Sequence, residues 1–203
     1  MGKIDLKKQR KKEALLQSAY ELFTTKGFQK TSILEIALHA GVAKGTFYLY
    51  YADKYSLRDD LIVHQSNLIF SQAMDALRRQ QIPLFADRII FIANYIIDYL
   101  ASDKKLVRFI SKNLSWALFK SALTTPSPNA EIDFRKVYYE IIRDSGLTFQ
   151  DPEIMLFMIV ELIGSTCNNT ILNEEPVSIE TFKPYLFAAI KAMIKAQIVS
   201  SAE

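Results

Sequence analysis

Apolar residues recur every three or four positions along almost the whole chain, which is the spacing of a buried stripe on an α-helix. No segment shows the sustained alternation of apolar and polar residues that is typical of a half-buried strand. The sequence therefore predicts an all-α protein. The predicted helices cover 6–26, 32–40, 44–51, 53–80, 84–101, 103–123 (in one or two pieces), 131–144, 151–173 and 178–199.

Several of these helices begin at residues with the right capping chemistry. Ser32 and Glu35 have the spacing of a capping box, in which each side chain binds the backbone N–H of the other. Asp53 can accept hydrogen bonds from the first free N–H groups of the long helix 53–80. Asp151 is followed by Pro152, a pairing that favours a helix start because proline lacks only an N–H that would be unpaired there. These signals place helix starts independently of the apolar period.

Composition narrows the class of protein. The chain has 203 residues, half of them hydrophobic, which is enough to bury a sizeable core. One cysteine and two histidines exclude a disulfide framework and a cysteine-based zinc site, and we expect no metal and no cofactor. The first dozen residues alternate basic and polar groups, unlike a signal peptide. The most apolar stretches, 89–97 and 154–164, are shorter than the ~20 residues of a membrane span, so we expect a cytoplasmic protein.

Charge is divided unevenly along the chain. Residues 1–58 contain 11 lysines and arginines against 5 acidic residues, whereas the remainder contains 14 against 17. A basic N-terminal quarter on a mildly acidic body suggests a module that binds a polyanion. A solvated basic tail would give the same numbers, so the charge alone leaves both interpretations open.

The segment 31–54 predicts two short helices on either side of a tight turn, as in a helix-turn-helix. Gly41 can adopt the left-handed backbone of such a turn, and Val42 and Phe47 anchor the second helix. An αα-hairpin in an ordinary bundle is the alternative, but it would not need two tyrosines and a glycine on a short exposed helix. The predicted outward face, which contains no acid and can enter the major groove, comprises Lys44, Gly45, Thr46, Tyr48 and Tyr50.

This segment resembles the signature of TetR-type transcriptional regulators. The residues that carry the resemblance are Ile36-Ala37, Ala40-Gly41-Val42, Gly45-Thr46-Phe47-Tyr48, Tyr50-Tyr51 and Lys54. Tyr51 stands where the family usually has phenylalanine, and we expect it to pack similarly. The resemblance implies a three-helix DNA-binding domain over residues 1–51 and a helical-bundle domain for effector binding and dimerisation over residues 52–203.

The resemblance also implies roles for individual residues. Thr31 and Ser32 would meet DNA phosphate at the start of the first short helix, and Tyr50 and Lys54 would grip phosphate. The residues that would read or approach bases are Lys44, Gly45, Thr46 and Tyr48. A basic cluster over residues 7–12 would add a phosphate-tracking arm, although cations at a helix N-terminus oppose the helix dipole. That mismatch fits a segment that orders only on DNA, and a solvated tail is the alternative.

We expect the effector site to lie among aromatic side chains and a few polar residues with apolar neighbours. Glu161 interrupts the apolar run 154–164, and His64 shares a stripe with leucines of the long helix. An exposed carboxylate and a hydrogen-bonded core histidine are the alternatives for these two residues. The candidate ligand-binding residues are His64, Phe91, Tyr95, Asn113, Trp116, Tyr138, Phe157 and Glu161.

The last two predicted helices, 151–173 and 178–199, carry apolar residues on more than one face. One face can pack on the body, and the surplus needs a partner, so we expect a homodimer with an isologous four-helix interface. The resemblance implies the same pairing.

No glycine-rich phosphate loop, serine-nucleophile elbow or zinc-protease motif is present, so we expect no enzyme. The sequence thus favours a regulator, most simply a repressor, that binds a palindromic DNA operator and is released by a small, largely apolar effector. The alternative is a DNA-binding protein of the same fold that is constitutive or controlled by a protein partner. An apolar cavity between helices 53–80 and 84–101 would favour the first, and a solid core would favour the second.

Overall fold

The computed structural model describes residues 3–111 and 134–199. Within these ranges the regular secondary structure is helical, apart from one isolated antiparallel bridge between Phe149 and Ile198, so the predicted all-α class is confirmed. The helices are α1 (Lys3–Thr25), α2 (Ile33–His39), α3 (Lys44–Phe47), α4 (Lys54–Arg78), α5 (Phe85–Ser102), α6 (Lys104–Ser111), α8 (Phe134–Ser145), α9 (Pro152–Asn173) and α10 (Ile179–Gln197).

The predicted capping residues begin the helices as expected. Ser32 and Asp53 each form a capping box at the starts of α2 and α4. Asp151 accepts hydrogen bonds from two backbone N–H groups of α9, with Pro152 in its first turn. Ser178 caps α10 in the same way through the N–H of Thr181. Each cap satisfies donors that the helix itself leaves free, which is why local sequence is sufficient to place these starts.

One predicted helix is shorter than expected. α3 ends at Phe47, whereas the apolar pattern predicted a helix over 44–51. The N–H of Leu49 donates to Thr46 O and that of Tyr50 to Phe47 O, so the chain continues in tighter turns with a three-residue spacing. Phe47 and Tyr51 are nevertheless both buried, at 0% and 5% exposure. The periodic pattern therefore marked the anchors correctly but not the end of the helix.

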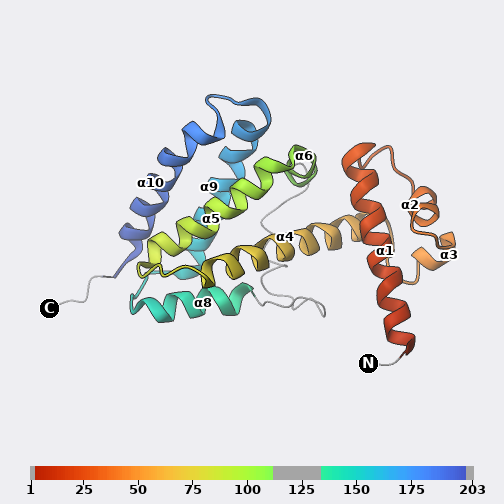
Figure 1. Ribbon diagram of the computed structural model, residues 1–203, viewed down its shortest axis with the longest axis horizontal. Coiled ribbons are helices and arrows are strands. Elements are labelled where there is room, and N and C mark those ends of the chain that lie inside the picture. The colour runs from red at the N-terminus through yellow and green to blue at the C-terminus, as the bar shows by residue number, and fades with distance from the viewer. Residues whose placement is uncertain (1–2, 112–133, 200–203) are drawn as a thin grey trace.

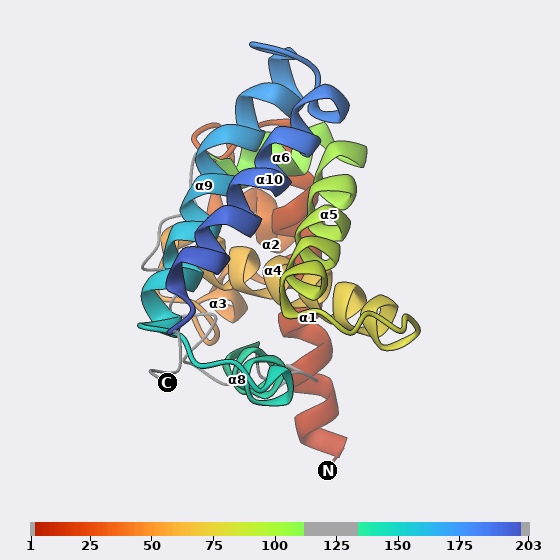
Figure 2. The ribbon, with the colours of Figure 1, turned by 90° about the vertical axis from the view of Figure 1, so that its left-hand side faces the viewer.

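The helices form a head and a body joined by α4 (Figure 1). α1, α2 and α3 make the head, and α5, α6, α8, α9 and α10 make the body, with α9 and α10 side by side (Figure 2). Two hydrophobic clusters correspond to these parts. The body cluster draws on α4, α5, α8, α9 and α10. The head cluster joins side chains of α1, α2 and α3 to Leu57, Leu61, Ile62 and Ile69 of α4 and to Leu106, Phe109 and Ile110 of α6.

The head therefore makes contact with the body through α6 as well as through α4. The Tyr20 hydroxyl on α1 donates to Asp103 Oδ2 at 2.6 Å, and Oδ1 of the same carboxylate caps α6 by accepting from the N–H groups of Lys105 and Leu106. Phe23 of α1 stacks on Phe109 of α6, with ring centroids 5.8 Å apart. Burial, followed by the bond to Asp103, raises the pKa of Tyr20 above its ordinary value, so the hydroxyl keeps its proton. The apolar packing of the head continues past residue 51, where the sequence predicts the domain boundary.

α9 matches the helix predicted over 151–173. Among the described helices it is the one that is long and apolar enough to cross a membrane by length and composition, a criterion that the core helix of a soluble protein also meets. The expectation that the chain has no membrane span therefore stays a prediction. In the body, α9 packs against α6 and α10, and 33% of its most apolar window is buried within this one chain.

Candidate nucleic-acid interface

The N-terminus of α2 is held rigid by a small polar network. The Ser32 hydroxyl accepts a hydrogen bond from the N–H of Glu35, and the Glu35 carboxylate accepts one from the N–H of Ser32 at 2.8 Å. Lys26, from the end of α1, also pairs with Glu35. The hydrogen bond from Lys26, followed by those from Ser32, lowers the pKa of Glu35 to about 2. Ser32 itself remains exposed at the helix end, where the free N–H groups favour an anion.

Thr31 and Lys54 occupy internal positions in this loop. Thr31 is 2% exposed, and its hydroxyl donates to Gly27 O at 2.9 Å. The Lys54 ammonium donates to Phe28 O at 2.8 Å and to Thr31 O at 2.9 Å, and it lies 4.4 Å from the centre of the Phe28 ring. Both side chains therefore hold the loop between α1 and α2, which is a different role from the phosphate contact that the resemblance implied for them.

The turn between α2 and α3 has the geometry expected from the sequence. Gly41 has a φ of +67°, in the left-handed region that residues with a side chain rarely adopt. The N–H of Val42 then donates to Ala37 O at 2.9 Å, which closes the turn. Phe47 is fully buried against the head cluster and fixes the rotation of α3 about its axis. The burial of Phe47 therefore determines which side chains of α3 point away from the head cluster.

The outward face of α3 is open and free of acidic groups. Lys44 and Gly45 are exposed, Tyr48 is 51% exposed, and Thr46 and Tyr50 are half-buried. A Cβ built on Gly45 would meet no atom within 4 Å, so nothing inside the protein requires a glycine there. The structure thus brings five predicted residues to one short surface, with a small residue at its centre.

Tyr51 has a role that sequence reasoning missed. Its ring is buried as expected, but its hydroxyl donates to Asp60 Oδ2 on α4 at 2.7 Å. The Lys12 ammonium of α1 lies 2.9 Å from the same oxygen. Burial, together with the negative charge of Asp60, raises the pKa of Tyr51 above its ordinary value, so the hydroxyl remains a donor. A tyrosine in place of the usual phenylalanine was the available signal, because a buried hydroxyl needs a partner.

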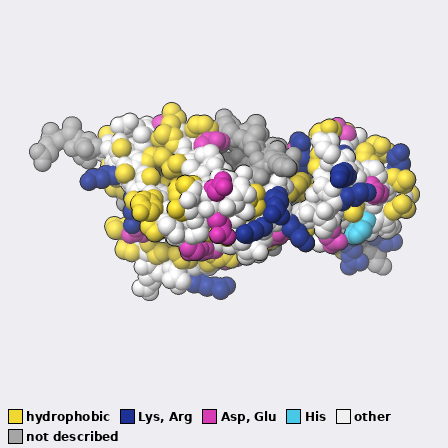
Figure 3. Space-filling view, turned by 90° about the horizontal axis from the view of Figure 1, so that it is seen from above, with side chains coloured by type: hydrophobic (Ala, Val, Ile, Leu, Met, Phe, Trp, Pro, Cys, Tyr) yellow, Lys and Arg dark blue, Asp and Glu magenta, His cyan; other side chains and the backbone are white. Residues whose placement is uncertain are grey.

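The basic cluster of the N-terminus is helical. α1 begins at Lys3, so the basic residues lie on a helix, and the expectation that this segment orders only on DNA stays a prediction. Lys7, Lys8, Arg10 and Lys11 are exposed. Lysine and arginine side chains also gather on the visible surface of the head and beside it, whereas hydrophobic side chains are more prominent on the body (Figure 3). The exposed cations on α1 extend the electropositive character of the head.

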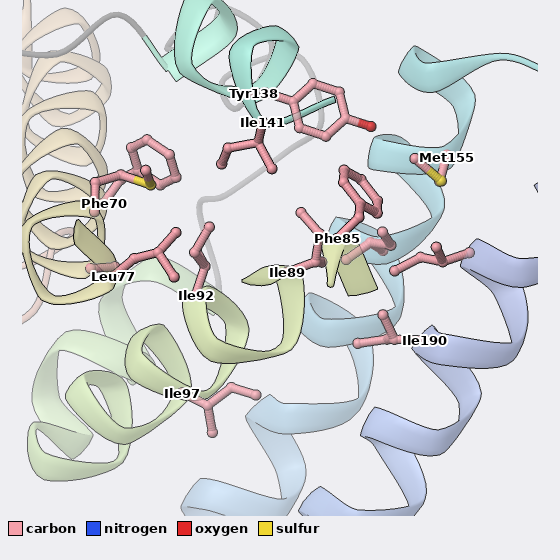
Figure 4. Packing of buried hydrophobic residues seen from close by; sticks show 14 of the residues in the cluster. Phe70, Leu77, Phe85, Ile89, Ile92, Ile97, Tyr138, Ile141, Met155 and Ile190 are labelled. Atoms are coloured by element: carbon pink, nitrogen blue, oxygen red, sulfur yellow. The ribbon is translucent and has the colours of Figure 1, made fainter. Parts of the chain in front are cut away.

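The body contains an apolar cavity of about 200 Å³ between α4, α5, α6, α8 and α9. Of the predicted ligand-binding residues, Tyr138 lines it. Figure 4 shows the Tyr138 side chain on α8, beside Ile141. Phe91 and Tyr95 pack against the body cluster without lining the cavity. The other predicted residues are His64 and Glu161, which are exposed; Phe157, which is 38% exposed; and Asn113 and Trp116, which lie outside the described residues.

A second, wider hollow of about 590 Å³ lies between the end of α4 and α8. Arg78 and Arg88 line it on one side, and Glu140 and Asp144 line it from α8. Its cations already have partners, since Arg78 pairs with Asp75 and Arg88 donates to Ile82 O. The smaller cavity is the better candidate for an apolar ligand because apolar side chains surround it.

Comparison with known proteins agrees with the head geometry. Residues 15–61 match the family described as bacterial regulatory proteins, tetR family. The uncharacterized helix-turn-helix regulator YvdT of Bacillus subtilis is 43% identical over 58 residues, covering 27% of this chain and 30% of YvdT. The similar regulator YerO of the same organism is 45% identical over 47 residues, covering 23% of this chain and 16% of YerO. The matches thus span less than a third of either relative.

Solved structures extend the likeness to the whole fold. The fatty acid degradation regulator FadR from Bacillus halodurans superposes with a TM-score of 0.65 at 16% identity, covering 88% of this chain and 96% of that one. FadR from Bacillus subtilis in complex with stearoyl-CoA has a TM-score of 0.57 at 17% identity, covering 90% and 97%. At these identities the likeness is one of fold. With the signature at 31–54 and the geometry of the head, these comparisons show that residues 15–61 match the N-terminal helix-turn-helix of the tetR family, in a chain that shares the fold of TetR-family regulators.

Proposed function

We propose that the protein is a cytoplasmic transcriptional repressor that binds a palindromic DNA operator as a homodimer and is released by a small, largely apolar effector. The observation that carries the proposal is the outward face of α3. It is exposed, lacks acidic groups and has open space above Gly45. A helix of this kind can lie in the major groove, where hydrogen bonds and methyl contacts distinguish base pairs.

The proposed DNA contacts fall into two groups. Lys44, Gly45, Thr46 and Tyr48 approach base edges, because they lie on the outward side of α3. Ser32 at the start of α2, together with Tyr50 and the exposed cations of α1, meets the phosphate backbone. Thr31 and Lys54 act indirectly by holding the loop that presents Ser32.

Homodimerisation through α9 and α10 is supported by the apolar groups that these helices leave uncovered. Ile154 on α9 is 53% exposed and Tyr185 on α10 is 74% exposed. Ala188, Ala189 and Ala192 are exposed on α10, where small side chains allow close approach of a second pair of helices. An isologous interface covers these residues in both copies at once.

Release of DNA follows from the way the two heads are held. Half-sites about one DNA turn apart, ~34 Å, tolerate little change in the distance between two recognition helices. α4 joins the head to the cavity, and α6 meets α1 through Tyr20 and Asp103. An effector that binds more tightly to a body with the wrong head spacing therefore weakens operator binding by its differential affinity.

The cavity between α4 and α5 supports an effector-responsive protein over a constitutive one. The Bacillus subtilis FadR structure contains stearoyl-CoA. A cavity of about 200 Å³ is only slightly larger than the ~150 Å³ that holds benzene. We therefore propose that the effector of this chain is far smaller than stearoyl-CoA.

A mobility-shift assay with DNA flanking the gene for this protein, repeated across a panel of small apolar compounds, tests the proposal. Tyr48→Ala should weaken operator binding by about 1–3 kcal/mol in a folded protein. Tyr139→Ala, which removes a 40% exposed tyrosine from the body, is the matched control and should leave binding unchanged. Unchanged binding by Tyr48→Ala would exclude the assignment, and a stable monomer in light scattering at micromolar concentration would exclude the dimer.

A further inference from the structure

We propose that the effector is an uncharged molecule the size of one substituted ring, and that a single hydrogen-bonding group on it meets Asn67 of α4. This inference rests on the proposed function only in naming the bound molecule an effector. The binding chemistry itself follows from the cavity.

The wall of the cavity excludes charged ligands. Apolar side chains of α5 and α9 dominate it, among them Ile92, Ile96 and Ile163, and none of the described residues that line it is charged. A carboxylate or an ammonium group moved from water into such a site without a partner loses its hydration and gains no ion pair. A ligand that binds here is therefore neutral.

The volume of the cavity limits the ligand further. A cavity of about 150 Å³ lined by apolar side chains holds benzene, and this one measures about 200 Å³. The difference leaves room for a small substituent on a ring, or for a compact aliphatic molecule of similar size.

Among the described residues that line the cavity, three have polar side chains: Ser66, Asn67 and Tyr138. The Tyr138 hydroxyl is committed, because it donates to Pro152 O at 2.7 Å and so joins α8 to the first turn of α9. Burial raises the pKa of Tyr138 above its ordinary value, which keeps this donor protonated. The Tyr138 hydroxyl therefore has a partner within the protein and offers little to a ligand.

Unlike Tyr138, Ser66 and Asn67 have polar groups that are available to a ligand. Both are half-buried, and in the described part of the chain neither side chain makes a hydrogen bond or an ion pair. An amide has two donor hydrogens and an acceptor oxygen, so Asn67 can bind an alcohol, a carbonyl or an ether. Because Asn67 belongs to α4, a ligand bonded to it acts on the next helix after α3 in the chain.

Three probes of nearly equal size test the inference on the full chain by calorimetry. Toluene fits the apolar wall, benzyl alcohol adds a neutral hydrogen-bonding group, and benzoate adds a charge. We expect benzyl alcohol to bind more tightly than toluene and benzoate not to bind. Asn67→Leu should weaken benzyl alcohol binding about threefold to tenfold and leave toluene unchanged, because one net hydrogen bond is lost.

Gln65→Leu is the matched control, since Gln65 is half-buried on the same helix and does not line the cavity. It should leave the binding of all three probes unchanged. If Asn67→Leu does not fold, Ala93→Trp provides the second variant, because Ala93 lines the cavity and the indole would occupy its volume. Binding of toluene and benzyl alcohol should then both be lost.

The inference is overturned if benzoate binds as tightly as benzyl alcohol, if no probe binds, or if benzyl alcohol binds Asn67→Leu and Ala93→Trp as it binds the unaltered chain. Operator binding without any probe is measured separately. A protein that binds operator but none of the neutral probes contradicts only this inference. A protein that binds benzyl alcohol through Asn67 but binds no operator contradicts only the proposed function.

Discussion

Replacement of Gly45 by alanine tests whether a glycine is needed at this position for the fold of the free protein or for the complex with DNA. Gly45 lies in α3, and a Cβ added there meets no atom within 4 Å. The backbone is helical at this residue, so the substitution introduces no conformational strain. We therefore expect Gly45→Ala to fold normally and to bind operator poorly.

The substitution should have opposite effects on the stability of the protein and on its affinity for operator. Alanine is favoured over glycine by up to about 1 kcal/mol in a helix, and less near its end, because glycine loses more backbone entropy on folding. In a chain of this size about 1 kcal/mol raises the melting temperature by roughly 2–4 °C. If the backbone at Gly45 lies against DNA, the added methyl group prevents that approach, and we expect operator affinity to fall at least about tenfold, or ~1.4 kcal/mol.

Gly41→Ala is the matched control, because the same chemical change four residues earlier should have the opposite effect on stability. A Cβ on Gly41 also meets no atom within 4 Å, but φ there is +67°. An alanine in this left-handed region costs about 1–2 kcal/mol, which lowers the melting temperature by roughly 2–8 °C. Both variants have room for the added methyl group, so a difference in their melting temperatures reports the effect of backbone conformation alone.

Calorimetric melting of both variants and fluorescence anisotropy with a labelled operator complete the test. A lower melting temperature for Gly45→Ala would show that this glycine serves the fold. Undiminished operator affinity in a folded Gly45→Ala protein would refute the proposal that DNA approaches the backbone there.

Three further outcomes are expected. Tyr51→Phe should lower the free energy of unfolding in urea by about 1–2 kcal/mol, because Asp60 loses a buried donor; no change would mean that water replaces it. Ala93→Trp should alter the response of DNA binding to effector more than DNA binding without effector, and a parallel loss of both with thermal stability would contradict the coupling. The pKa of Glu35 is lowered to about 2, so its contribution to stability is present above its ordinary value of 4.5 and is lost as the pH falls towards 2. Glu35→Gln should flatten stability over that window, and an unaltered pH profile would exclude the Lys26 and Ser32 contacts as its source.

Local sequence was sufficient wherever a feature depends on neighbours in the chain. Ser32, Asp53 and Asp151 cap helices because their side chains bind N–H groups two or three residues away. The left-handed turn at Gly41 is equally local. The outward face of α3 could be predicted because burial of Phe47 fixes the other side of one helical turn. For this reason the sequence alone determined the all-α class and the helix-turn-helix.

The roles of Lys54 and Tyr51 depended on the tertiary structure. Lys54 binds the carbonyls of Phe28 and Thr31, more than 20 residues earlier, and Tyr51, which precedes α4, donates to Asp60 within that helix. A sequence motif marks such positions without showing whether the side chain faces DNA or its own fold.

The apolar cavity of the body was the least predictable feature. Aromatic residues such as Phe91 have the right chemistry for a pocket, yet they pack against the core, and isoleucine is the most frequent residue among the described ones that line the cavity, with Asn67 at its wall. Whether an apolar side chain fills space or borders a void depends on how five helices from distant parts of the chain fit together. No periodicity within one helix contains that information, which is why only the tertiary structure decided it.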